Sequence, residues 1–187
     1  MDILELNEVL ISGERQTISM LAERGVVTAL SGNSYERLSL YLKAILGFVD
    51  ISNGHICIDG EPLTKHTATF FRSQMAYAPA RLETVGEIVS YEPPSVQEVF
   101  SLKSNQSIAI SNGILAEEIR RIGADSGDNR IRWIAVAALL ERPILLVENP
   151  PLLAMTYLHQ IAAKGRIVIV TSNDTAVLTN SNKVIEI

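Results

Sequence analysis

Short apolar segments alternate along this sequence with segments of helical periodicity, and this alternation limits the architectures open to the chain. The apolar segments are rich in β-branched residues and carry little charge, as do strands buried on both faces. They are residues 25–30, 74–79, 144–147, 166–172 and 183–187. Because helical patterns stand between most of them, we predict an α/β fold with a mostly parallel sheet flanked by helices.

Two regions depart from this alternation. Residues 3–10 and 16–21 alternate apolar and polar side chains around the turn "ISGER", which predicts an antiparallel β edge. Residues 81–124 contain "YEPPS", a polar stretch, and helical patterns at 96–102 and 114–122. We therefore predict one domain, 1–187, with a helical subdomain inserted at 81–124.

Composition limits the partners and the compartment. Hydrophobic residues make up 47% of the chain and its net charge is −5, so it can form a core but has no electrostatic basis for binding nucleic acid. The single cysteine, Cys57, is predicted to be a buried thiol in a reducing compartment. We find no signal peptide and no apolar run long enough to span a bilayer. We expect a cytoplasmic protein that meets a membrane only through a partner.

The stretch "LSGNSYERLSLYL", residues 30–42, has the length of a phosphate-binding loop between a strand and a helix. Ser34 is the expected helix N-cap, and Gly47 the expected stop. Such a loop follows G-x-x-x-x-G-K-[ST], in which glycines let backbone N–H groups surround phosphates and lysine reaches the terminal ones. The eight positions are occupied by Gly32, Asn33, Ser34, Tyr35, Glu36, Arg37, Leu38 and Ser39. Gly32 and Ser39 match, whereas Arg37 replaces the second glycine and Leu38 the lysine.

Three longer sequence segments carry a family resemblance. "LKAILGFVDISNGHICIDGEPL", "RIRWIAVAALLERPILLVENP" and "IVIVTSND" follow one another at compatible spacing. Together they resemble the nucleotide-binding domain of ABC transporters, and the resemblance covers nearly the whole chain. It implies a P-loop NTPase-type sheet with a helical subdomain, working with a membrane subunit.

The resemblance also assigns site positions. At Walker B, where the family has aspartate and glutamate for magnesium and water, the chain has Glu148 and Asn149. The switch-histidine position is Ser172, and the Q-loop glutamine position is Ala80. The signature loop becomes residues 125–129, in which Ser126 and Gly127 match and Asp128 adds a negative charge. The adenine-stacking aromatic is replaced by Ser12.

These substitutions favour a non-hydrolytic subunit with a decayed nucleotide site, no catalytic residues and no bound cofactor. Its partner would be a competent ABC ATPase, a membrane permease or a second copy of itself. The alternative is a divergent but active ATPase, in which Ser39 and Glu148 would hold magnesium and Arg37 would assist with ATP. A third possibility is a binding module that takes a small anion near Gly32. Residues 81–100 would either pack internally or face a partner.

Overall fold

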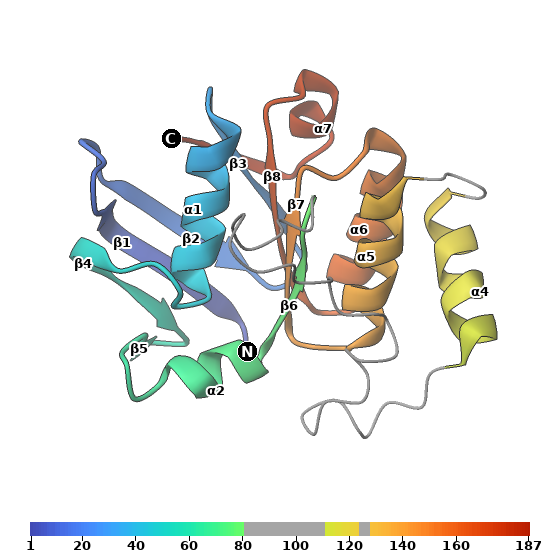
Figure 1. Ribbon diagram of the computed structural model, residues 1–187, viewed down its shortest axis with the longest axis horizontal. Helices are drawn as coiled ribbons and strands as arrows, with labels where there is room; N and C mark the ends of the chain where they lie inside the picture. The colour runs from blue at the N-terminus through green and yellow to red at the C-terminus, as the bar shows by residue number, and fades with distance from the viewer. Residues whose placement is uncertain (81–110, 124–127) are drawn as a thin grey trace, which may run out of the picture.

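The computed structural model describes residues 1–80, 111–123 and 128–187. A five-stranded parallel sheet with the order β6-β7-β8-β3-β9 lies at its centre (Figure 1). Its strands are β3 (Val27–Ser31), β6 (Met75–Ala78), β7 (Ile144–Glu148), β8 (Ile167–Ser172) and β9 (Lys183–Glu186). Every neighbouring pair is parallel, so the prediction of a mostly parallel sheet from the apolar segments is confirmed.

A second, antiparallel sheet has the order β2-β1-β4-β5. Its strands are β1 (Ile3–Ile11), β2 (Ile18–Glu23), β4 (Ile51–Ile58) and β5 (Glu61–Pro62). The expected antiparallel edge is thus present. Strands β4 and β5 form a hairpin, because Asp59 and Gly60 adopt positive φ angles of 49° and 84° and reverse the chain.

The helices mostly follow the predicted pattern. They are α1 (Tyr35–Ile45), α2 (Ala68–Ser73), α4 (Asn112–Gly123), α5 (Asn129–Leu139), α6 (Met155–Ala163) and α7 (Thr175–Thr179), with the 3₁₀ turn η2 (Leu152–Ala154) before α6. Helix α4 confirms the helical pattern at 114–122, whereas the pattern at 96–102 lies outside the described residues. The limits of the predicted insert, 81–124, stay a prediction. Helix α2 was missed because six residues are too few to show helical periodicity.

Alternate residues of the parallel strands enter two separate cores. On β7, Ile144 and Leu146 pack with α1 and the antiparallel sheet, whereas Leu145 and Val147 pack with α5 and α6. Successive side chains of a strand point to opposite faces, so burial on both faces requires an apolar residue at every position. The continuously apolar segments of the sequence therefore lie at the centre of three layers.

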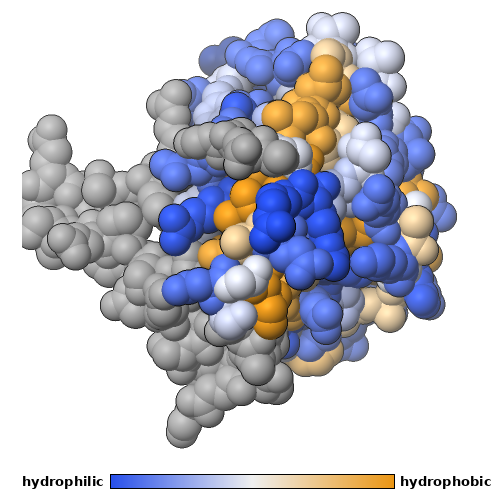
Figure 2. Space-filling view, turned by 90° about the vertical axis from the view of Figure 1, so that its right-hand side faces the viewer, coloured by the Kyte–Doolittle hydropathy of each residue, from blue (hydrophilic) through white to orange (hydrophobic). Residues whose placement is uncertain are grey.

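The outer surface is more polar. Figure 2 views the molecule from the right-hand side of Figure 1, and hydrophilic side chains there surround a few groups of apolar ones. Among the described residues, no helix combines the length and the apolar character needed to cross a membrane. The single cysteine, Cys57, is a buried thiol on β4 as predicted, and burial raises its pKa.

Candidate functional site at the start of helix α1

Most of the predicted site residues meet at one edge of the parallel sheet. Strands β7, β8 and β3 are neighbours, and they end at Glu148, Ser172 and Ser31. Ser31 lies opposite Ser172 in the parallel register, and Glu148 lies opposite Thr171. The carboxyl ends of parallel strands are the usual place for ligands in open α/β sheets. The fold therefore brings together the phosphate-loop, Walker B and switch positions.

Helix α1 begins within the candidate phosphate loop. Only Gly32, Asn33 and Ser34 separate β3 from the first helical residue, Tyr35. Ser34 is the N-cap, as predicted, and its hydroxyl accepts the N–H of Arg37 at 3.2 Å. The carbonyl of Ser34 accepts the N–H of Leu38 at 3.1 Å. The N–H groups at two of the eight loop positions therefore have partners inside the protein.

Two side chains of this segment are held internally. Leu38, at the lysine position, is fully buried in the core beneath α1. The guanidinium Nε of Arg37 lies 2.9 Å from the carboxylate of Glu14, in the turn between β1 and β2. Burial raises the pKa of the neighbouring Tyr41, and the Arg37 guanidinium acts in the opposite direction. Arg37 is thus tied to Glu14.

Gly32 lies against the last residue of the chain. The N–H of Ile187 donates to the carbonyl of Ser31 at 2.8 Å, and a Cβ on Gly32 would lie 3.0 Å from the Ile187 carbonyl oxygen. Beside this contact is an open, polar cavity of about 820 Å³, lined by Asn33, Arg37 and Arg15 among others. This is where the predicted anion site near Gly32 would lie.

Ser39 and Glu148 form a buried hydroxyl–carboxylate pair. The Ser39 hydroxyl donates to Oε1 of Glu148 at 2.6 Å, and the N–H of Ala80 donates to Oε2 at 3.2 Å. Both side chains are buried, so these hydrogen bonds offset the cost of removing the carboxylate from water. The sequence placed both residues at magnesium positions, and the structure brings them into direct contact.

These two residues are too few to hold a magnesium ion by themselves. Mg²⁺ requires six oxygen ligands in near-octahedral geometry. Within the described ranges there is no group of three or more histidine, cysteine or acidic residues that could hold a metal. Both oxygens of Glu148 also already accept hydrogen bonds from the protein. A metal here would depend on phosphate or water for most of its ligands.

The remaining catalytic positions are engaged with the backbone. Asn149 has a positive φ of 41°, and its N–H donates to the carbonyl of Thr171 at 2.9 Å. Ser172 is fully buried, and its hydroxyl accepts the N–H of Asp174 at 3.0 Å ahead of α7. Neither position carries a group that titrates near neutral pH, as a general base would.

Asp128 and Arg130 form an ion pair that the sequence interpretation missed. Ser126 and Gly127 lie outside the described residues, and Asp128 is the N-cap of α5. Arg130 donates to both oxygens of Asp128, from Nε to Oδ1 at 3.0 Å and from Nη2 to Oδ2 at 2.6 Å, and this holds the pKa of the carboxyl below its usual value. Arg130 is half-buried, and its Nη1 donates to the carbonyl of Asn149 at 3.0 Å. The Asp-x-Arg spacing at a helix start was the available signal.

Comparisons with known proteins identify similar sequences and structures. No family model matches the chain. An ATP-dependent lipid A-core flippase from Hahella chejuensis is 25% identical over 195 residues, which cover 91% of this chain and 32% of the flippase. A similar protein from Xanthomonas oryzae is 28% identical over 71% of this chain and 25% of its own length. The chain therefore spans about a third of the length of the curated relatives it matches, or less.

A solved structure extends the likeness to the whole fold. The structure of cbiO1 from Clostridium perfringens, described as part of the ABC transporter complex cbiONQ, superposes with a TM-score of 0.72 at 18% identity. The match covers 100% of this chain and 85% of cbiO1. The chain thus resembles the ATP-binding subunits of ABC transporters and has their P-loop NTPase-type fold.

Proposed function

We propose that this protein is a non-hydrolytic, ABC ATPase-like subunit that acts by binding and regulating a partner in a transporter-type complex. The observation that carries the proposal is the position of the α1 N-terminus. In a phosphate-binding loop, free backbone N–H groups point at the ligand. Here the N–H groups of Arg37 and Leu38 both donate to Ser34, and the Leu38 side chain lies in the core.

The charges at the site also argue against a bound triphosphate. Arg37 is neutralised by Glu14, and the Glu36 carboxylate, in the first turn of α1, accepts the hydroxyl of Ser34 at 2.9 Å. A phosphate group would meet Glu36 as a like charge, which is unfavourable at short range. At the start of α1, one cation and two of the backbone N–H groups that could meet a triphosphate are thus already engaged within the protein.

The retained packing supports a role in an assembly. The two cores and both sheets are fully formed although the site positions differ from the family pattern, which supports a role other than hydrolysis. The partner in this proposal is a competent ABC ATPase, a membrane permease or a second copy of this chain. The similarity to cbiO1, described as part of a transporter complex, points in the same direction. Such a protein would act at the cytoplasmic face of a membrane, held there by its partner.

One observation favours the alternative of an active, divergent ATPase. The Ser39 hydroxyl and Glu148 carboxylate, 2.6 Å apart, are an oxygen pair of the kind that lies beside magnesium in nucleotide sites. In that alternative, Mg·ATP would supply the missing ligands, and transport would be powered directly. It requires the first turn of α1 to unwind so that the N–H groups of Arg37 and Leu38 become free.

Calorimetric titration with Mg·ATP, together with a phosphate-release assay on the unmodified chain, separates these functions. We expect a dissociation constant weaker than about 1 mM and no turnover, with a competent ABC ATPase domain as the positive control. Micromolar affinity with turnover would establish the alternative. Micromolar affinity without turnover would be consistent with the non-hydrolytic role. It would contradict the proposal that the N-terminus of α1 is unavailable to a triphosphate.

A further inference from the structure

A second cavity lies away from the site at the start of α1, between the C-terminal end of α1, strand β4 and the start of α2. Its volume is about 220 Å³. Its apolar lining residues include Val49, Ile51, Ile56 and Leu63. The volume is below the roughly 300–1,000 Å³ of pockets that hold drug-sized ligands. A nucleotide would not fit, whereas a molecule with a short aliphatic side chain would.

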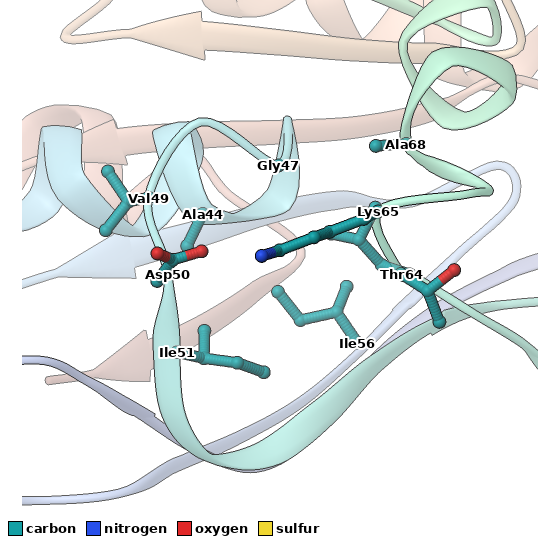
Figure 3. A pocket seen from close by; sticks show the side chains of 10 residues that line it. Ala44, Gly47, Val49, Asp50, Ile51, Ile56, Thr64, Lys65 and Ala68 are labelled. Carbon is teal, nitrogen blue, oxygen red and sulfur yellow. The ribbon is translucent and has the colours of Figure 1, made fainter.

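Two opposite charges face each other across this cavity. Figure 3 shows the Lys65 side chain stretching across the opening with its ammonium directed toward the carboxylate of Asp50. No ion pair joins the two groups, and neither side chain has a hydrogen-bond partner among the described residues. Both are solvent-exposed, so a ligand can reach them. The space between them suits a group that carries one charge of each sign.

The backbone holds both sides of the opening in place. Asp50 follows the α1 terminus, where Gly47 has a φ of +72° and the N–H of Phe48 donates to the Lys43 carbonyl at 2.9 Å. On the other side, the N–H of Leu63 donates to the Ile56 carbonyl at 2.7 Å. A turn before α2 follows, in which the N–H of Thr64 donates to the Thr67 hydroxyl at 2.8 Å. A site whose frame is already ordered loses less entropy on binding.

We propose that this cavity binds a free aliphatic α-amino acid. Its ammonium group would lie against Asp50, its carboxylate against Lys65, and its side chain against the apolar lining residues such as Ile51 and Ile56. The zwitterion satisfies both charges at once, and the aliphatic part removes apolar surface from water. An aliphatic amine or acid alone would leave one of the two protein charges without a partner. Such an amino-acid site does not depend on the proposed function.

Titration with L-leucine, followed by methyl NMR of Ile51, Ile56 and Leu63, tests the proposal. We expect those methyl signals to shift with leucine and to shift far less with glycine, which lacks the aliphatic part. N-acetyl-leucine and leucinamide each lack one charge and are expected to bind at least about tenfold more weakly, as fits the loss of one charge-assisted hydrogen bond.

Two variants link each charge to its residue. Asp50→Asn should weaken leucine binding about tenfold and reduce the discrimination against N-acetyl-leucine. Lys65→Met should weaken leucine binding to a similar extent and reduce the discrimination against leucinamide. Glu61→Gln and Lys164→Met are matched controls, since they make the same changes at exposed positions outside the cavity and should leave binding unchanged. Absence of methyl shifts at millimolar leucine, equal binding of glycine, or equal affinity in the Asp50 and Lys65 variants would each overturn the proposal.

Discussion

At the scale of single residues, the site is defined by what its side chains are bound to inside the protein. Leu38 packs in the core, Arg37 pairs with Glu14, and Ser39 donates to the buried Glu148. Each of these positions is one where a nucleotide-binding loop presents a group to the ligand. These side chains therefore interact within the protein, and substitutions at these positions should change its stability.

Replacing Leu38 by lysine should destabilise the protein rather than restore a nucleotide site. The position is fully buried, so the ammonium group would lose water without gaining a partner. We expect the free energy of unfolding in urea to fall by about 3 kcal/mol or more. Leu38→Met, which conserves volume, should cost less than about 1.5 kcal/mol. A Leu38→Lys protein that is as stable as the parent and binds Mg·ATP would show that the α1 N-terminus rearranges readily.

The Asp128–Arg130 pair should make stability depend on pH. The folded-state pKa of Asp128 is lowered, so its contribution is present above its unfolded pKa of about 3.9 and is lost as the pH falls through the folded value. Asp128→Asn retains the N-cap and removes the charge. We expect a cost of up to about 1 kcal/mol at pH 7 that is smaller at pH 3, measured by urea unfolding.

A second substitution separates capping from charge at this position. Asp128→Ala removes the acceptor for the Arg130 N–H as well, and should cost about 1 kcal/mol from the lost cap at both pH values. Equal costs of Asp128→Asn at pH 7 and pH 3 would contradict the assignment of the charge effect to this ion pair.

At the scale of elements, the antiparallel sheet depends on a close approach between β1 and β4. Strand β1 has a bulge at Glu8, whose φ is 49°, and its register with both neighbours shifts there. Opposite the bulge, Gly54 has a φ of +78°, and a Cβ there would lie 2.3 Å from the carbonyl oxygens of Asn7 and Glu8. Only glycine lets the two backbones meet in this way.

Gly54→Ala should therefore destabilise the protein strongly. We expect the free energy of unfolding to fall by about 3 kcal/mol or more, because both the φ angle and the backbone contacts oppose a side chain. Gly60→Ala is the matched control. Gly60 has a similar φ of +84°, but a Cβ at that position would have nothing within 4 Å, so it should cost only about 1 kcal/mol of backbone strain. If the two variants lose equal unfolding free energy in urea, the β1–β4 backbone contact must adapt to a side chain at little cost.

Some of these elements were predictable from sequence patterns and others were not. The N-cap Ser34 and the strand β3 before it were predictable from local signals, and so was the apolar strand ending at Glu148. The hairpin β4–β5 and helix α2 were not, because a positive φ at a non-glycine residue such as Asp59 and a six-residue helix leave little periodic signal. Both elements line the further cavity, which for that reason has no signature in the sequence.

At the scale of the whole molecule, helix α4 is attached at the outside of the α5–α6 layer (Figure 1). The buried hydroxyl of Tyr157 on α6 donates to the carboxylate of Glu118 on α4. Glu118 also lies 3.2 Å from the Arg121 guanidinium. Burial, followed by the hydrogen bond to Glu118, raises the pKa of Tyr157 well above its usual value, so the phenol remains a donor throughout the ordinary pH range.

Tyr157→Phe should loosen α4 while leaving the parallel sheet unchanged. Removing the hydroxyl leaves Glu118 with one partner fewer in a partly buried place, at a cost of about 1–2 kcal/mol. Hydrogen exchange of the α4 amides should become roughly 5- to 30-fold faster. The amides of β7 and β8 serve as the internal control and should exchange as before. Unchanged exchange in α4 would mean that apolar packing alone holds the helix.

Sequence alone determined the layered α/β architecture, because strands buried on both faces must be apolar at every position and such continuously apolar segments can be recognised in the amino-acid sequence. It also determined which chemical groups stand at the ends of β3, β7 and β8. Tertiary structure alone decided their partners: Glu14 for Arg37, and Ser39 and Ala80 for Glu148. Such pairs join residues from different elements or depend on rotamers, and no local pattern encodes the distances between them.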